Sequence, residues 1–315
     1  MDFDFSEDQQ MLMTAFEGLL APWTQAPQGL HGYTVYSAEL QAEIAAAGFM
    51  EIAAQPGFSL LDAALLVEAG AACPVSVELA SSMMIAPLLA NAEGPLAVAS
   101  ALGQPVRYLP VSQSVCLFHD GDVWQAPVAS AQIEVLDSVA AYPLGRLARV
   151  PNAASKLSSD LAGTIRRRAL IGIAAEAAGL MRGAIDCTVA YVRERQQFGQ
   201  PLGHFQAIQH RLAESAQLAR ASRWLAFRAA DSERESDAAT ACLYAQESMR
   251  KVITDCHQFT GAMGLTLEWP LHLWTYRMKV LQGEFGGKGA QARRLAQSAW
   301  PETATEAAAL PEMAM

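Results

Sequence analysis

A long stretch rich in small and aliphatic residues, Leu161 to Val192, constrains the fold more than any other feature of this sequence. It consists mostly of Ala, Ile, Leu and Gly, a composition typical of a helix that is buried on several sides. Further helical patterns follow at about 205–232, 237–263 and 268–299. The last of these is interrupted by Gly283, Gly286, Gly287 and Gly289. We therefore expect a C-terminal four-helix bundle over residues 151–300.

The first third of the chain also has helical patterns. Ser6 and Gln9 have the spacing of a capping box ahead of an amphipathic run that reaches Pro22. Three more helices are expected, at Ala38–Ala47, Leu60–Ala72 and Leu79–Ala90. The sequence thus predicts an N-terminal helical domain over residues 1–103.

Residues 104–150 have a pattern typical of strands and not of helices. Short β-branched and aromatic runs flank His119-Asp120-Gly121-Asp122, a hairpin-like turn. We expect an abbreviated β domain of four or five strands, within a mainly α protein that has only this small β domain. The tail, residues 301–315, is rich in Ala, Glu, Thr and Pro and is expected to be disordered.

Composition narrows the classes of function. The formal net charge of −10 argues against nucleic-acid binding, which normally needs a basic face. Five cysteines without a CxxC pair indicate neither a metal site nor a disulfide framework. The acidic opening MDFDFSEDQQ lacks the pattern of a secretory leader, and no apolar run reaches the ~18 residues of a spanning helix. We expect a cytoplasmic protein with no membrane contact.

The first informative motif is Tyr191 to His210, which reads YVRERQQFGQPLGHFQAIQH. A helix ends in a charged turn, the chain bends at Gly199 and Pro201, and a new helix begins. Arg195 and Phe198 can offer a guanidinium to a diphosphate and a ring to a flat cofactor. The alternative is structural: Arg195 pairs with Glu194 or Glu214, and Phe198 belongs to the core.

The second motif is a glycine-rich bend after a helix. Cys256 to Leu273 reads CHQFTGAMGLTLEWPLHL. Absent side chains at such a bend let a ligand approach the backbone closely.

Together the two motifs resemble the C-terminal bundle of acyl-CoA dehydrogenases. The first is similar to that family's YxxxRxQFGxPLxxFQxxQxxLA signature and the second to its QxxGGxGxTxE segment, with Ala262 where the family commonly has a second glycine. Looser similarity covers residues 1–100 and 106–297. Within this family, the chain resembles the short subunit of bacterial heterotetrameric, steroid side-chain type acyl-CoA dehydrogenases.

The resemblance implies that the bundle binds the adenine and diphosphate half of an FAD whose ring lies on a neighbouring subunit. By motif, Arg195 is expected to contact the diphosphate. The adenosine side is expected to be lined by Gln197, Phe198 and Leu202, supported by Gln206. From the second bend, the residues expected along the same cofactor are Gln258, Gly261 and Ala262.

Two features of a complete family member are missing. The flavin-holding TEPxxGSD type of strand has no counterpart between Ala92 and Gln113. The family's catalytic carboxylate aligns with Phe285 or Gly286, and in other members with Ala169, so no acid stands in register. Glu284 lies close to the first position and is the one candidate base. Glu176 is expected to serve as a partner between helices.

These observations lead to one favoured function and two alternatives. The favoured function is that of a subunit in an FAD-dependent α,β-dehydrogenation of a bulky, steroid-like acyl-CoA. A longer acyl-CoA dehydrogenase subunit, in an α2β2 assembly, would supply the flavin ring and the base, and electrons would pass to an electron-transfer flavoprotein or a similar acceptor. The alternatives are a self-sufficient homo-oligomer that uses Glu284 and a structural or regulatory subunit without FAD contact.

Overall fold

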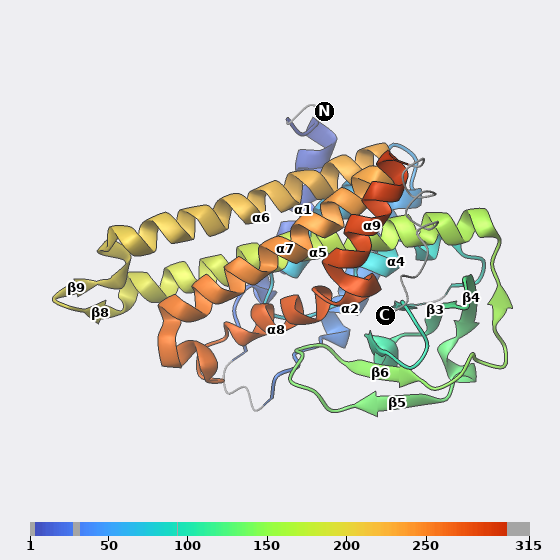
Figure 1. Ribbon diagram of the computed structural model, residues 1–315, viewed down its shortest axis with the longest axis horizontal. Coiled ribbons are helices and arrows are strands. Elements are labelled where there is room, and N and C mark those ends of the chain that lie inside the picture. Colours follow the sequence, from blue (N-terminus) through green and yellow to red (C-terminus); the bar gives the residue numbers. More distant parts are fainter. Residues whose placement is uncertain (1–3, 28–31, 93, 301–315) are drawn as a thin grey trace, which may run out of the picture.

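The computed structural model describes residues 4–27, 32–92 and 94–300, and it is mainly helical (Figure 1). The predicted tail, residues 301–315, lies outside the described residues. The N-terminal helices are α1 (Glu7–Leu20), α2 (Ala38–Ala46), α3 (Leu60–Ala71) and α4 (Ala80–Met84). The capping box before α1 is confirmed, because the Ser6 Oγ accepts from the Gln9 amide and the Gln9 side chain accepts from the Ser6 amide, each at 3.2 Å. Helix α4 is shorter than expected because a 3-10 turn that contains Pro87 follows it.

Seven strands of the described chain form the β domain, in two small sheets. One sheet has the order β1-β3-β4-β7, with β1 and β3 parallel and the other pairs antiparallel, and the second is antiparallel with the order β2-β6-β5. The strands are β1 (Leu96–Ala99), β2 (Pro105–Arg107), β3 (Ser114–His119), β4 (Asp122–Pro127), β5 (Ile133–Leu136), β6 (Leu144–Leu147) and β7 (Ser155–Lys156).

The strands extend past the expected limits of the β domain at both ends. Strand β1 lies before residue 104 and β7 lies after residue 150. The alanines of β1 have little strand propensity of their own, and this segment is a strand because it pairs with β3 along its whole length. Strand β7 is only two residues long, too short to produce a recognisable alternation.

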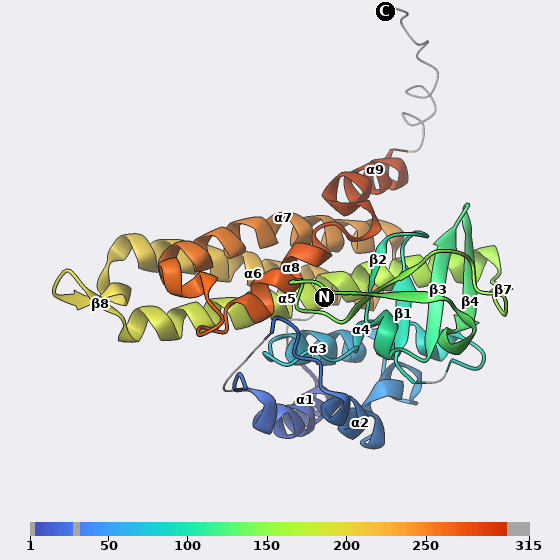
Figure 2. The same cartoon turned by 90° about the horizontal axis from the view of Figure 1, so that it is seen from below.

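The C-terminal bundle is built around α5 (Ser159–Glu194), a helix of 36 residues. The helices α6 (Gln206–Ser232) and α7 (Glu235–Thr260) lie alongside α5 (Figures 1 and 2). The expected last helix is divided into α8 (His272–Leu281) and α9 (Gly287–Ala299), as the glycines between them suggested. Among the described residues, no helix is long and apolar enough to cross a membrane.

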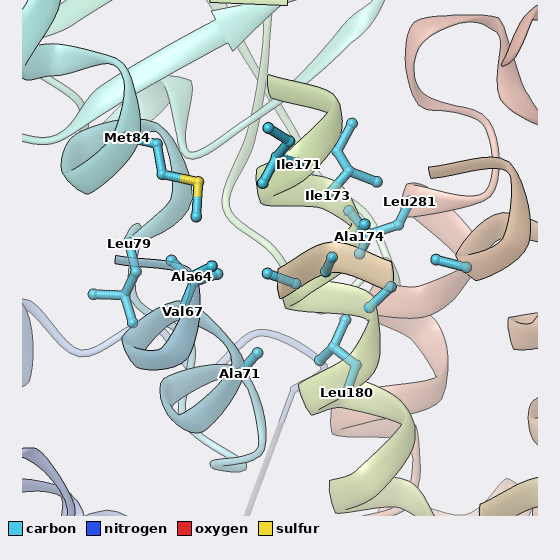
Figure 3. Close-up of a cluster of buried hydrophobic side chains, with 14 of the residues drawn as sticks. Ala64, Val67, Ala71, Leu79, Met84, Ile171, Ile173, Ala174, Leu180 and Leu281 are labelled. Carbon is cyan, nitrogen blue, oxygen red and sulfur yellow. The ribbon is translucent and has the colours of Figure 1, made fainter. Parts of the chain in front are cut away.

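Two glycines of α5 let neighbouring helices pack against it closely. A Cβ on Gly179 would lie 2.1 Å from the Glu68 carbonyl oxygen of α3, and a Cβ on Gly183 would lie 2.2 Å from the Trp274 Nε1 of α8. Trp274 in turn donates to the Ala72 carbonyl at 2.8 Å. Small and aliphatic side chains, together with Met84, form the part of this core that Figure 3 shows. This close packing sets the position of α5, which carries Glu176 and leads into the hairpin that contains Phe198.

Candidate functional site

The chain leaves α5 through a tight hairpin. Strand β8 (Gln196–Gln197) pairs with β9 (Gln200–Pro201), and the Leu202 amide donates to the Arg195 carbonyl at 2.8 Å. The two turn residues, Phe198 and Gly199, both have positive φ, 56° and 82°, as the central residues of two-residue hairpin turns require. Such backbone is common for glycine and strained for phenylalanine. The turn holds Phe198 at the tip of the hairpin.

This hairpin presents its side chains to solvent. Arg195, Gln197 and Phe198 are exposed, and the Phe198 side chain keeps 88% of its accessible surface. Within the described part of the chain, Arg195 makes no ion pair, and Glu214 pairs with Lys251 at 3.1 Å. The structural alternative, in which Arg195 is paired and Phe198 is core, is therefore not realised among the described residues.

The second bend lies at the end of α7. Gly261 follows the helix with φ 57° and ψ −139°, a conformation that essentially only glycine adopts. A Cβ on Gly261 would meet no atom within 4 Å. Gln258, Gly261 and Ala262 are all exposed, and so is Leu265, at 70%.

The fold brings both motifs to the same end of the bundle (Figures 1 and 2). Phe259 of α7 packs with Val192 of α5 and with Leu212 of α6, and Leu202 covers this small cluster. Tyr191 also meets Trp269 edge to face, with ring centroids 5.2 Å apart. Val192, three positions before Arg195, thus packs with Phe259, which follows Gln258, although the two motifs are some sixty positions apart in the sequence.

A buried carboxylate supports this end of the bundle. Asp255 on α7 accepts from Ser215 at 2.9 Å and from Lys251 at 2.9 Å, and it also bonds Arg211. Burial opposes the charge of Asp255, but the hydrogen bonds from Lys251, Arg211 and Ser215 outweigh it and lower its pKa. Sequence reasoning missed this cluster. Its only local signal is the spacing of Lys251 and Asp255 by one helical turn.

The open surface at this end suits one half of an anionic dinucleotide. It offers an exposed guanidinium that has no ion pair within the described ranges, an exposed aromatic ring and a glycine with free space beside it. Leu202 is half-buried beside the hairpin, and Gln206 is exposed at the start of α6. Because these groups lie on a surface and not in a cavity, they can hold only one side of a ligand.

A second region, at the β domain, holds both carboxylates that the sequence singled out. Arg107 of β2 donates to Glu284 through Nε at 2.6 Å and through Nη2 at 3.0 Å. Its Nη1 donates to both oxygens of Glu176, at 2.9 and 2.8 Å, and the Tyr142 hydroxyl donates to Glu176 at 2.7 Å. The partners of Glu176 therefore come from the β domain and not from another helix, which corrects the expectation for that residue.

Charge balance explains this arrangement. The side chains of Arg107, Glu176 and Glu284 keep only 12%, 9% and 19% of their accessible surface. Burial disfavours the charge on Arg107, but the two carboxylates overcome it and raise the pKa of the guanidinium well above its usual value. Both oxygens of Glu284 are engaged by Arg107.

Comparison with known proteins identifies the bundle. Residues 167–299 match the family model described as "Acyl-CoA dehydrogenase, C-terminal domain". The bundle is thus similar to the C-terminal domain of acyl-CoA dehydrogenases. The acyl-CoA dehydrogenase IpdE2 of Mycobacterium tuberculosis is 29% identical over 253 residues, which are 78% of this chain and 79% of IpdE2. The expected resemblance to acyl-CoA dehydrogenases is confirmed.

Solved structures extend the likeness to the whole fold. One chain of the ChsE4-ChsE5 complex from Mycobacterium tuberculosis superposes with a TM-score of 0.78 at 21% identity and covers 99% of this chain and 100% of that one. The Tcur3481-Tcur3483 steroid ACAD gives 0.77 at 21%, with coverage of 96% and 99%. The mainly α fold with a small β domain is thereby confirmed. Among longer curated relatives, the chain spans as little as 19% of the relative's length.

In this acyl-CoA dehydrogenase fold, the two expected positions of the base meet in one place. Ala169 of α5 and Phe285 line the same small cavity, together with Arg107 and Glu284. This cavity has a volume of only 20 Å³, room for little more than one water molecule. Glu284 and Phe285 also line a wider cleft of 970 Å³ that opens beside the β3–β4 hairpin. No carboxylate stands at either expected base position.

Proposed function

We propose that this chain is the shorter subunit of an FAD-dependent acyl-CoA dehydrogenase, and that it supplies the adenine and diphosphate half of the cofactor site to a longer partner. One observation carries this proposal. Arg195 and Phe198 are exposed on the hairpin, at the bundle end that Gln258 and Gly261 also reach, and among the described residues Arg195 makes no ion pair. An exposed cation and an exposed ring, both held by a strained turn, suit a surface that is completed by a second molecule.

The roles of this chain's own residues follow from their chemistry. Arg195 neutralises a diphosphate through charge-assisted hydrogen bonds, and Phe198 with Leu202 packs against the adenosine, with Gln197 and Gln206 beside them. Gln258, Gly261 and Ala262 approach the same cofactor from the second bend. FAD held in this way would supply the acceptor for the hydride from the β-carbon of the thioester, while the α-proton would pass to the base.

The longer partner is proposed to hold the flavin ring, the acyl-CoA and the base. This rests on the absence of a carboxylate at positions 169, 285 and 286 and on the engagement of Glu284 by Arg107. An α2β2 assembly in the cytoplasm, with an electron-transfer flavoprotein or a similar acceptor, fits such a subunit. The substrate is proposed to be a bulky, steroid-like acyl-CoA, supported by the fold that the chain shares with a steroid ACAD.

The test is expression of this chain alone and together with a longer acyl-CoA dehydrogenase from its own genomic neighbourhood. We expect the pair to purify as one complex with stoichiometric FAD and to oxidise acyl-CoA, whereas the lone chain does neither. A lone chain that retains stoichiometric FAD and turns over acyl-CoA would refute the proposal. Glu284→Gln in the lone chain tests the homo-oligomer alternative, which requires turnover by the lone chain and its loss in this variant while FAD remains bound; unchanged turnover would reject Glu284 as the base.

A further inference from the structure

Arg107 and Glu284 line the small cavity where the two expected base positions meet, and Glu176 adjoins them through its hydrogen bonds with Arg107. Each carboxylate receives two hydrogen bonds from the same guanidinium, all between 2.6 and 3.0 Å. The planar guanidinium also lies 4.9 Å from the centre of the Tyr142 ring. Arg107 comes from the β domain, Glu176 from the middle of α5 and Glu284 from the turn before α9, so the cluster joins three separate parts of the fold.

The backbone around Glu284 is bent in a way that serves this contact. Phe285, Gly286 and Gly287 follow in succession with φ values of 51°, 84° and 64°. A buried phenylalanine at positive φ persists only where its surroundings determine it fully. Here the Phe285 ring packs edge to face on Phe118 at 5.3 Å, and the Phe285 carbonyl accepts from Gln291 at 3.2 Å. These contacts hold the Glu284 carboxylate against Arg107, at the edge of the cleft that Glu284 also lines.

Removal of the arginine side chain would leave a space walled by two carboxylates. Two like charges at such close range repel each other strongly when they are poorly solvated. A cation of guanidinium shape is therefore the group that this space accepts. Without an arginine at position 107, Glu176 and Glu284 would face an unfilled, doubly acidic space, and Glu284 also lines the 970 Å³ cleft.

We infer that Arg107 is a built-in plug, which fills a pocket preformed by Glu176 and Glu284 and so keeps this chain's own base region closed to any substrate. The inference rests on the proposed function only in naming an acyl thioester as the molecule that is kept out. Arg107 also ties the β domain to the bundle, because it lies on β2 and its partners lie on α5 and before α9. Removal of one partner from such a buried ion pair is strongly destabilising.

The experiment is chemical rescue of Arg107→Ala in the full chain. We expect the variant to lose roughly 5–8 °C in Tm, from the usual loss for a broken buried pair and the entropy of unfolding of a chain this long. Methylguanidinium chloride should restore part of this loss, whereas an equal concentration of sodium chloride should not. The matched control is Arg146→Ala, because Arg146 lies in the same sheet and pairs with Glu134 at 3.3 Å on a half-exposed surface.

Equal effects of methylguanidinium on the wild type, Arg107→Ala and Arg146→Ala would overturn the inference, and so would an unchanged Tm of Arg107→Ala. If Arg107→Ala does not fold, Arg107→Lys tests the inference instead, through its Tm. It keeps the charge but loses the paired geometry of the guanidinium, so a Tm equal to that of the wild type would refute the plug. None of these measurements involves FAD or turnover, and their outcome is independent of whether the proposed function holds.

Discussion

Replacement of Arg195 by alanine is the most direct perturbation of the proposed half-site. The side chain is exposed and makes no ion pair within the described chain, so its removal leaves no buried group unsatisfied and should leave the fold intact. A hydrogen bond to a charged group contributes about 1.5–3 kcal/mol. Because 1.4 kcal/mol corresponds to a factor of ten, the affinity of the assembled complex for FAD should fall roughly 10- to 150-fold.

The assay is titration of the deflavinated complex with FAD, followed by the change in flavin fluorescence, with the FAD content after gel filtration as a second measure. Arg234→Ala is the matched control, because Arg234 is an exposed arginine at the other end of α7. We expect Arg234→Ala to bind FAD like the wild type. An unchanged affinity in Arg195→Ala, with the complex intact, would refute the reasoning and favour a subunit without cofactor contact.

Two further predictions concern the contribution of Asp255 and Gly264 to the stability of the folded chain. The lowered pKa of Asp255 means that its charged form stabilises the folded state above the ordinary value of 3.8, and that this contribution disappears as the pH falls through the lower, folded-state pKa. Asp255→Asn should flatten the acid limb of a Tm-against-pH curve, and an unchanged limb would contradict this. Gly264→Ala should reduce stability by about 1–3 kcal/mol, since its Cβ would lie 2.0 Å from the Thr260 Oγ1. Gly289→Ala is the control and should not reduce stability, because a Cβ there would lie 3.8 Å from its nearest neighbour, the Arg293 Nη1. Urea unfolding measures the stability of both variants.

The sequence was sufficient to predict the helical bundle and the approach of its two motifs, around Arg195 and around Gln258. The long apolar stretch that starts at Leu161 is dominated by one residue class, so its burial and its length follow directly, and α5 spans Ser159–Glu194. The proximity of Arg195 and Gln258 was also predictable, because each motif reports a local bend and the family resemblance supplies their relation in space. The positive φ of Phe198 was not, since phenylalanine rarely adopts it.

The role of Arg107 could not be predicted. Its partners are 69 and 177 positions away along the chain, and no periodicity links residues at such separations. Glu176 gave a partial signal, because an acid in an apolar helix needs a compensating cation. That signal says that a partner exists but not which one. The early start of the β domain was missed for a similar reason, since β1 depends on its pairing with β3.

The tight turn at Phe198 has a thermodynamic consequence for assembly. The hairpin is closed by its own backbone hydrogen bonds and is covered at its base by the cluster around Phe259. Its conformational entropy is therefore already lost in the isolated chain, and an incoming surface has little more to order. A partner that binds this hairpin therefore incurs a smaller entropy cost than one that binds a loop which becomes ordered only on binding. A given contact area consequently gives a higher affinity and a more stable complex.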